Sequence, residues 1–175
     1  RRRLSHAFVF GFTAFPKLLA LTDAAVNIAP DLHDKADIAR NAIDLCRALG
    51  VAAPKLAVLA ATEAVNPAMP ATIEAAALAK MAERGQIRYG IVDGPLAFDI
   101  AISARAAQEK GVVSRVAGEP DILLVPDIEA GNMLYKQAAY LAGADCAGVV
   151  LGMRVPIILT SRSDSVASRV ASCAL

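Results

Sequence analysis

The sequence predicts an α/β fold, with a mixed, mostly parallel sheet that has helices on both of its faces. Three observations lead to this prediction. Short apolar runs alternate with segments of helical periodicity along most of the chain, which is typical of parallel strands joined by crossover helices. Glycine follows most of the helical segments, as it does at helix ends. Hydrophobic residues fill 56% of the 175 positions but aromatic residues only 5%, so Ala, Val, Ile and Leu must fill the core.

Seven apolar runs bounded by turn residues are predicted to be strands. They lie at residues 5–10, 17–22, 55–61, 88–92, 121–125, 148–151 and 156–160. The connections at 11–16 and 152–155 are too short for a crossover, because parallel neighbours need a dozen or more residues between them. Where these strands are neighbours, they must therefore pair in antiparallel fashion.

Five segments with apolar residues at helical spacing are predicted to be helices. They cover residues 34–49, 72–84, 97–110, 129–142 and 163 to the end of the chain. Thr72 is placed to cap the second helix, and Gly50 to end the first. In the first helix, Arg40 and Asp44 lie four residues apart, so we expect them to pair on its outer face.

Composition excludes several function classes. The 18 basic and 17 acidic residues leave a net charge of +1, without the basic excess that a nucleic-acid partner requires. No apolar stretch approaches the ~18 residues of a membrane span, so no membrane partner is expected. Cys46, Cys146 and Cys173 fit no disulfide or zinc pattern, and we expect buried free thiols in the reducing cytoplasm. His6 and His33 are too isolated for a metal centre or a catalytic triad, and surface or capping positions are expected for both.

Polar residues follow five of the predicted strands, at the carboxyl ends where open α/β sheets bind ligands. Helix capping is the alternative explanation for each of them. The run at 160–165 exceeds what capping needs, since Thr160, Ser161, Arg162 and Asp164 lie among further hydroxyls at the start of a predicted helix. Hydroxyls and a guanidinium at a helix N-terminus favour an anion such as phosphate. A serine-rich turn with a solvated Arg162 remains the alternative.

Two further clusters stand out. Asp127 opens a predicted helix that also has Gly131 and Asn132 in its first turns, where neither residue favours a helix and where a ligand often approaches a glycine backbone. The other cluster is a turn at Asp93 and Gly94, with Asp99 beyond it. The chain contains no G-x-G-x-x-G, P-loop or H-E-x-x-H motif, so dinucleotide, P-loop and zinc-protease functions lack their signatures. Acid–base chemistry must then be done by Asp, Glu or solvent.

Four ordered motifs, at residues 21–27, 92–99, 125–132 and 158–162, resemble the phosphate acetyltransferase and phosphate butyryltransferase family. The resemblance runs from about Ser5 to the end of the chain and is greatest to the transferase half of bifunctional proteins with an upstream enoyl-CoA hydratase domain. It implies that residues 1–175 form the C-terminal portion of the family domain, without its N-terminal portion. It also implies a fold similar to one lobe of the isocitrate and isopropylmalate dehydrogenases, in a homodimer.

The resemblance further implies transfer of an acetyl or butyryl group between coenzyme A, as a substrate, and phosphate, with no bound cofactor or metal. Ser161 and Arg162 match the family's Ser-Arg pair, which would hold the acyl phosphate as catalytic residues. The positions expected to bind substrate are Thr160, Asp93, Gly94, Asp99, Asp127, Gly131 and Asn132.

Two positions depart from the acetyl-specific branch of that family. Seven residues after its Ser, where that branch has an Asp as the proposed base, this chain has Ser168, and the nearer Asp164 is expected to take the catalytic role. Tyr140 stands before Leu141 where the same branch has an Arg. Both differences resemble the butyryl-type branch. The alternative from another class is a catalytically inactive dimerisation or scaffold lobe that lacks its partner lobe.

Overall fold

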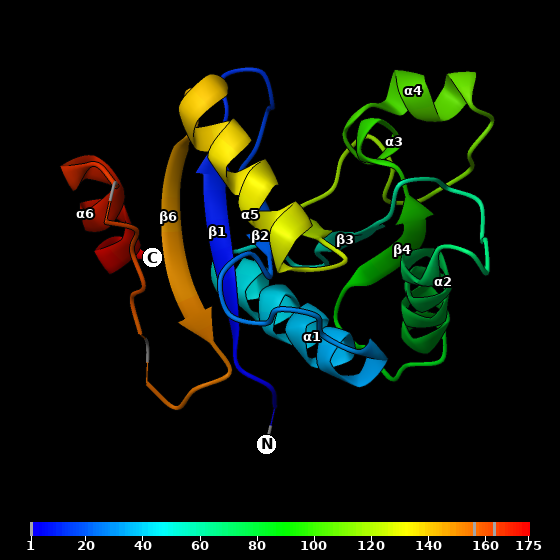
Figure 1. Ribbon diagram of the computed structural model, residues 1–175, viewed down its shortest axis with the longest axis horizontal. Coiled ribbons are helices and arrows are strands. Elements are labelled where there is room, and N and C mark those ends of the chain that lie inside the picture. Colours follow the sequence, from blue (N-terminus) through cyan, green and yellow to red (C-terminus); the bar gives the residue numbers. More distant parts are fainter. Residues whose placement is uncertain (1, 156, 163) are drawn as a thin grey trace.

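The computed structural model describes residues 2–155, 157–162 and 164–175, and in this part of the chain six strands form one mixed sheet (Figure 1). The order in the sheet is β4-β3-β5-β2-β1-β6. The strands are β1 (Ser5–Gly11), β2 (Leu19–Thr22), β3 (Lys55–Leu59), β4 (Ile91–Leu96), β5 (Ile122–Leu124) and β6 (Asp145–Leu151). The pairs β2–β5, β3–β5 and β3–β4 are parallel, whereas β1 is antiparallel to both β2 and β6. The predicted mixed, mostly parallel sheet is confirmed.

Three of the strand predictions need correction. β4 begins at Ile91 rather than at residue 88, because a turn precedes it in which Tyr89 has a φ of 69°. β6 begins three residues earlier than expected, since all seven of its residues pair with β1. Among the described residues of 156–160 there is only an isolated antiparallel bridge between Val150 and Ile157; Pro156 lies outside the described residues.

Helices cover both faces of the sheet, as predicted (Figure 1). One face carries α1 (Leu32–Ala48) and α2 (Pro70–Glu83). The other carries α3 (Phe98–Ile102), α4 (Ala104–Glu109), α5 (Ile128–Lys136) and the π-helical turn η1 (Gln137–Leu141). Helix α6 (Val166–Ala174) packs against β6, and Ser163, where it was expected to begin, lies outside the described residues.

Two helix predictions were wrong in detail. The helix expected at 97–110 is divided at Ser103, whose extended backbone ends α3 and whose side chain accepts a hydrogen bond from the Ala106 N–H to cap α4. Thr72 does not cap α2. The helix begins at Pro70, and the Thr72 hydroxyl instead donates to the Met69 carbonyl at 2.8 Å.

Strand β1 contributes to the core on both faces of the sheet, because alternate side chains of a strand point to opposite sides. Ala7 and Val9 belong to the buried cluster under α1 and α2. Phe8 and Phe10 belong to the buried cluster under α3 and α5. Most of the large side chains in both clusters are aliphatic, as the composition predicts.

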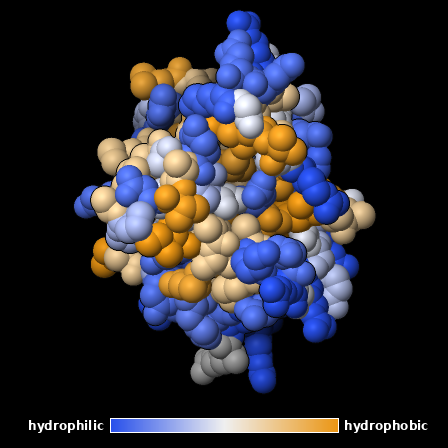
Figure 2. Space-filling view, turned by 90° about the vertical axis from the view of Figure 1, so that its right-hand side faces the viewer, coloured by the Kyte–Doolittle hydropathy of each residue, from blue (hydrophilic) through white to orange (hydrophobic). Residues whose placement is uncertain are grey.

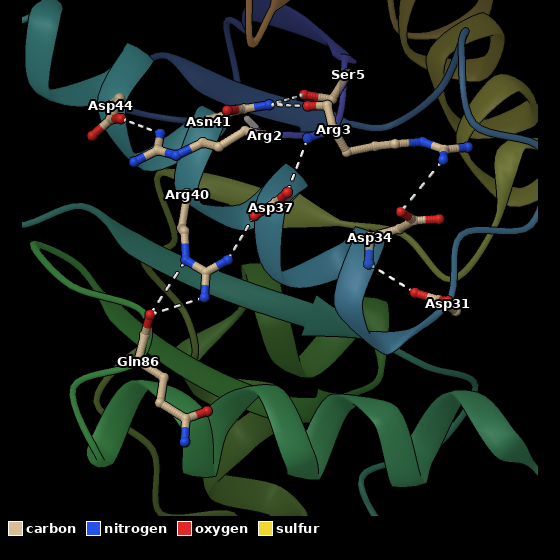
Figure 3. Close-up of polar contacts among 10 residues, drawn as sticks. All are labelled: Arg2, Arg3, Ser5, Asp31, Asp34, Asp37, Arg40, Asn41, Asp44 and Gln86. Atoms are coloured by element: carbon tan, nitrogen blue, oxygen red, sulfur yellow. Dashed lines mark hydrogen bonds and ion pairs between the residues drawn. The ribbon is translucent and has the colours of Figure 1, made fainter.

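Polar contacts hold the residues before β1 against α1 (Figure 3). Arg2 pairs with Asp44 at 2.5 Å, and the backbone N–H of Arg3 donates to Asp37 Oδ2 at 2.9 Å. Asp37 also accepts from Arg40 Nη1 at 2.7 Å. The expected pair of Arg40 with Asp44 is therefore wrong, since each residue takes another partner that the sequence spacing does not reveal.

The β4 side of the molecule presents apolar patches between hydrophilic residues (Figure 2). Val113, which lines a cleft with Ile91 and Val92 of β4, is fully exposed, and Tyr89, two residues before β4, is 63% exposed. Among the described residues, the structure contains no helix with both the length and the hydrophobicity to cross a membrane.

Candidate functional site

The first cluster lies at the start of α5, directly after β5. Asp127 caps the helix, since its Oδ1 accepts from the Ala130 N–H at 2.8 Å. The backbone N–H of Ile128 donates to the Ile28 carbonyl at 3.0 Å. The structure therefore gives Asp127 a capping role, which was the alternative explanation for its position.

Gly131 packs against the loop that follows β2. A Cβ at this position would lie 2.9 Å from each of three atoms: the Ala24 Cα, the Asp23 carbonyl oxygen and the Val125 Cγ2. The close approach that we expected from a ligand is thus made by the chain's own backbone. Asn132 faces the same loop, with its Nδ2 3.5 Å from the Ala24 carbonyl.

Asp23 holds this loop in shape, and the sequence analysis did not assign it a role. It is 2% exposed, and its Oδ1 accepts from the N–H groups of Ala25 and Val26, both at 3.0 Å. Its Oδ2 accepts from the Asn27 N–H at 3.2 Å and from Asn27 Nδ2 at 2.5 Å. The detectable signal was an Asp with an Asn four residues later, directly after a strand.

The second cluster consists of residues 160–162 together with Asp164, which joins this turn to α5. Asp164 Oδ1 accepts from the Tyr135 hydroxyl at 2.8 Å, and Oδ2 accepts from the Ser161 N–H at 2.6 Å. The Asp164 N–H in turn donates to the Ser161 carbonyl at 3.2 Å. Ser161 and Asp164, two of the three residues predicted to be catalytic, are therefore directly connected.

Tyr135 is the contact in this cluster that the sequence analysis missed. It is 4% exposed, and its ring stacks on Phe8 with centroids 4.0 Å apart and planes inclined by 5°. Burial, followed by the hydrogen bond and the charge of Asp164, raises the pKa of Tyr135 well above its ordinary value. The hydroxyl therefore keeps its proton and donates a hydrogen bond to Asp164. The available signal was its spacing, four residues after Gly131 on the buried face of α5.

Arg162 is the exposed member of the turn. Among the described residues its guanidinium forms no ion pair, while its carbonyl accepts from Arg169 Nη2 at 3.2 Å. Thr160 and Ser161 are half-buried beside it. An exposed guanidinium next to hydroxyls can bind an anion.

His6 lies under the chain that leads into this turn, and its expected surface position was wrong. It is fully buried, its Nε2 lies 3.4 Å from the Leu159 carbonyl, and its ring meets the edge of Phe8 at 4.4 Å. Among the described residues Nδ1 has no hydrogen-bond partner. Burial lowers the pKa of His6, against the opposing effects of the Leu159 carbonyl and the carboxylates of Asp23 and Asp164.

The third cluster lies elsewhere on the sheet. Asp93 and Gly94, in strand β4, line a cleft of about 470 Å³ together with Lys80, Ser114 and Arg115. Asp99 does not line this cleft; it is exposed and pairs with Lys110 at 2.8 Å, and this hydrogen bond lowers its pKa.

The distance between the clusters follows from the strand order. Strand β4 and strand β1, over which the Tyr135 ring stacks, are four strand spacings apart. At about 4.8 Å per spacing this amounts to roughly 19 Å. Within this chain the structure therefore brings the second cluster and α5 together, but not the third.

The three cysteines and the side chains that could bind a metal remain to be placed. Cys46 and Cys146 are buried and free, as expected, but Cys173 is exposed on α6. Burial raises the pKa of Cys46 to about 12 and also raises the pKa of Cys146. Within the described ranges, no three His, Cys, Asp or Glu side chains are grouped so that they could hold a metal ion.

Proteins of known family resemble this chain along its whole length. The family model described as phosphate acetyl/butaryl transferase matches residues 2–175. A phosphate acetyltransferase of Rhizobium meliloti is 58% identical over 175 residues, which is 100% of this chain and 55% of that protein. A phosphate butyryltransferase of Clostridium acetobutylicum is 46% identical over 174 residues, 99% of this chain and 58% of that protein.

Among solved structures, a branched-chain phosphotransacylase from Enterococcus faecalis V583 superposes with a TM-score of 0.90 at 37% identity. The match covers 99% of this chain and 62% of that one. The chain thus spans about half the length of the curated relatives it matches.

Proposed function

Because the chain belongs to the phosphate acetyl/butaryl transferase family, we propose that the protein containing it transfers an acyl group between coenzyme A and phosphate. The turn at Ser161 and Arg162 is the observation that supports this most directly. An exposed guanidinium without an ion-pair partner among the described residues lies there beside half-buried hydroxyls, at the positions that match the family's Ser-Arg pair. The names of the relatives, which are those of enzymes, do not favour the alternative of an inactive scaffold lobe.

In the proposed reaction, the thiolate of coenzyme A attacks the carbonyl carbon of the acyl phosphate. A carbon–sulfur bond forms, the bond between carbon and the phosphate oxygen breaks, and phosphate leaves with the electron pair. Arg162 would hold the phosphate oxygens and balance the charge that grows on them as the bond breaks. Ser161 would fix the same group through its hydroxyl. The reverse reaction forms acyl phosphate from acyl-CoA and phosphate.

The thiol must lose its proton before it attacks. A thiol with a pKa of about 8.5 is mostly protonated at neutral pH, so a nearby base raises the fraction of thiolate. We propose Asp164 for this role, because it is the carboxylate in contact with Ser161. Both of its oxygens already accept one hydrogen bond, but a carboxylate oxygen can accept two. Ser168 accepts from the Ser165 hydroxyl at 3.1 Å in the first turn of α6 and is not an acid–base group.

Release of coenzyme A thiol from an acyl-CoA tests the proposal. The full-length protein should release thiol only when phosphate or arsenate is present. Arg162→Ala should lower kcat/KM for phosphate by 100-fold or more, about the loss seen when one such charge-stabilising group is removed. Arg105→Ala is the matched control, since this arginine is exposed on α4 and, among the described residues, pairs with Glu109 alone. Thiol release by the wild type without phosphate, or unchanged turnover in Arg162→Ala, would contradict the proposal.

The acyl group remains part of the proposal. Ser168 and Tyr140 stand where the acetyl-specific branch of the family has other residues, whereas a phosphate acetyltransferase is the more similar of the two relatives described above, so we propose acetyl or butyryl as the transferred group. A rate series from acetyl-CoA to hexanoyl-CoA on the full-length protein distinguishes the two, and a maximum at hexanoyl-CoA would refute both. We also propose a homodimer from the resemblance to this family. Light scattering of the full-length protein as it leaves a size-exclusion column tests it.

A further inference from the structure

Tyr135 is a buried hydroxyl group that the proposed reaction does not use directly. It lies on α5, two turns beyond the Asp127 cap, and its ring is fixed by stacking on Phe8 at 4.0 Å. Phe8 is held in turn by the His6 ring at 4.4 Å. The Tyr135 ring is 4% exposed and also lies 6.3 Å from the Phe10 ring, so packing against two aromatic rings restricts the orientation of its hydroxyl.

The Asp164 side chain connects the Tyr135 hydroxyl to the Ser161–Arg162 turn. It donates to Asp164 Oδ1 at 2.8 Å, while the other oxygen of Asp164 accepts from the Ser161 N–H at 2.6 Å. Two charge-assisted hydrogen bonds therefore connect the turn to α5, and such bonds are stronger than hydrogen bonds between neutral groups. Two neighbouring contacts are longer: His6 Nε2 lies 3.4 Å from the Leu159 carbonyl, and Arg169 Nη2 donates to the Arg162 carbonyl at 3.2 Å.

We propose that Tyr135 is a positioning residue for the phosphoryl group: its hydroxyl orients Asp164, and Asp164 in turn orients Ser161 and Arg162. This inference rests on the proposed function of the Ser161–Arg162 turn. Tyr135 itself touches no substrate in this scheme. Without its hydroxyl, Asp164 keeps the bond to Ser161 but can rotate about it, so the phosphate-binding groups lose their fixed orientation.

Tyr135→Phe tests the proposal with little effect on packing, because the ring and its stacking on Phe8 are retained. In the full-length protein it should lower kcat/KM for phosphate about tenfold, as expected for loss of one hydrogen bond to a charged group. Because Asp164 is also the proposed base, the change should appear in kcat as well as in KM for phosphate, with the KM for acyl-CoA nearly unchanged. Tyr89→Phe is the matched control. Tyr89 is 63% exposed, and its ring lies under Arg47 at 4.5 Å, a contact that phenylalanine keeps.

A double-mutant cycle separates positioning from a purely structural role. If Tyr135 acts through Asp164, then Tyr135→Phe combined with Asp164→Asn should be no slower than Asp164→Asn alone. Multiplicative losses in the double variant, or wild-type phosphate kinetics in Tyr135→Phe, would overturn the inference. A fall in melting temperature as large in Tyr135→Phe as in Tyr135→Ala, with no change in KM for phosphate, would assign it to stability alone.

The experiment also distinguishes this inference from the proposed function on which it rests. If the wild type releases no thiol with phosphate, the proposed function has failed before Tyr135 is tested. If the wild type is active and Arg162→Ala is not, but Tyr135→Phe behaves as the wild type, only the positioning role is refuted.

Discussion

Gly131→Ala is the substitution whose outcome depends most directly on how α5 is seated. Gly131 has an ordinary helical backbone conformation. If the space around it were open, alanine would therefore stabilise the helix by about 1 kcal/mol. The space is not open. The new Cβ would lie 2.9 Å from Ala24 Cα, from the Asp23 carbonyl oxygen and from Val125 Cγ2. Two of these three atoms are backbone and cannot move by changing a rotamer.

The magnitude follows from these opposing effects. Overpacking a tight core costs about 1–3 kcal/mol, and contact with two backbone atoms places this case at the upper end. Subtracting the gain in helix propensity leaves a net loss of about 2 kcal/mol in the free energy of unfolding. For a domain of this size that corresponds to a fall of about 4–8 °C in melting temperature.

Thermal and urea denaturation followed by circular dichroism measure this loss in the full-length protein. Gly85→Ala is the control, because no atom lies within 4 Å of a Cβ there and only the positive φ of 73° opposes alanine. That strain is worth about 1–2 kcal/mol. If Gly131→Ala stabilises the protein, the close packing of α5 on the 23–24 backbone is wrong, and Gly131 would again be free to serve a ligand.

Two other buried groups give further tests. Burial lowers the pKa of His6 below its ordinary 6.5, so the unfolded chain takes up a proton that the folded chain does not, and the free energy of unfolding should fall as the pH drops through and below 6.5. His6→Gln should flatten this dependence in thermal melts, and parallel curves for the two proteins would contradict it. The pKa of Cys46 is raised to about 12, so a thiol reagent near neutral pH should label the exposed Cys173 first and reach Cys46 only in denaturant. Rapid labelling of Cys46 in the native protein, detected by mass spectrometry of its peptides, would contradict this burial of the thiol.

Local patterns in the sequence predict the architecture well. The alternation of apolar runs and helical segments predicts the sheet with helices on both faces, and the short connection at 11–16 predicts that β1 and β2 are antiparallel. These features depend on neighbouring residues. The division of the helix at Ser103 is also local, but the hydroxyl that caps α4 resembles any other serine in a helical segment, so its signal was too weak to separate two helices.

The missed parts of the site depend on long-range contacts. His6 and Leu159 are 153 residues apart in the chain, and Tyr135 and Asp164 are 29 apart. No periodicity or motif connects residues at such separations. The sequence could place Ser161, Arg162 and Asp164 in one turn because they are neighbours, but it could not show which buried group holds that turn.

The register of β1 connects these long-range contacts to one another. Because side chains alternate along a strand, His6 and Phe8 face α5 while Ser5 and Ala7 face α1, and a shift of one residue would exchange the two sets. The register is fixed on both sides, with Phe8 opposite Leu21 in β2 and opposite Gly148 in β6. On the α1 side, Asn41 Nδ2 donates to Ser5 Oγ at 3.0 Å.

Gly148 leaves the space that the His6 ring occupies, since a Cβ there would lie 2.9 Å from His6 Nε2. Strand pairing therefore positions the His6 and Phe8 rings. The Phe8 ring in turn positions Tyr135, whose hydroxyl binds Asp164. The chemistry proposed for Ser161 and Arg162 depends on this packing as much as on their own side chains. Substitutions in β1 or β6 should thus alter the phosphate binding that we propose for this turn, even though they replace none of its residues.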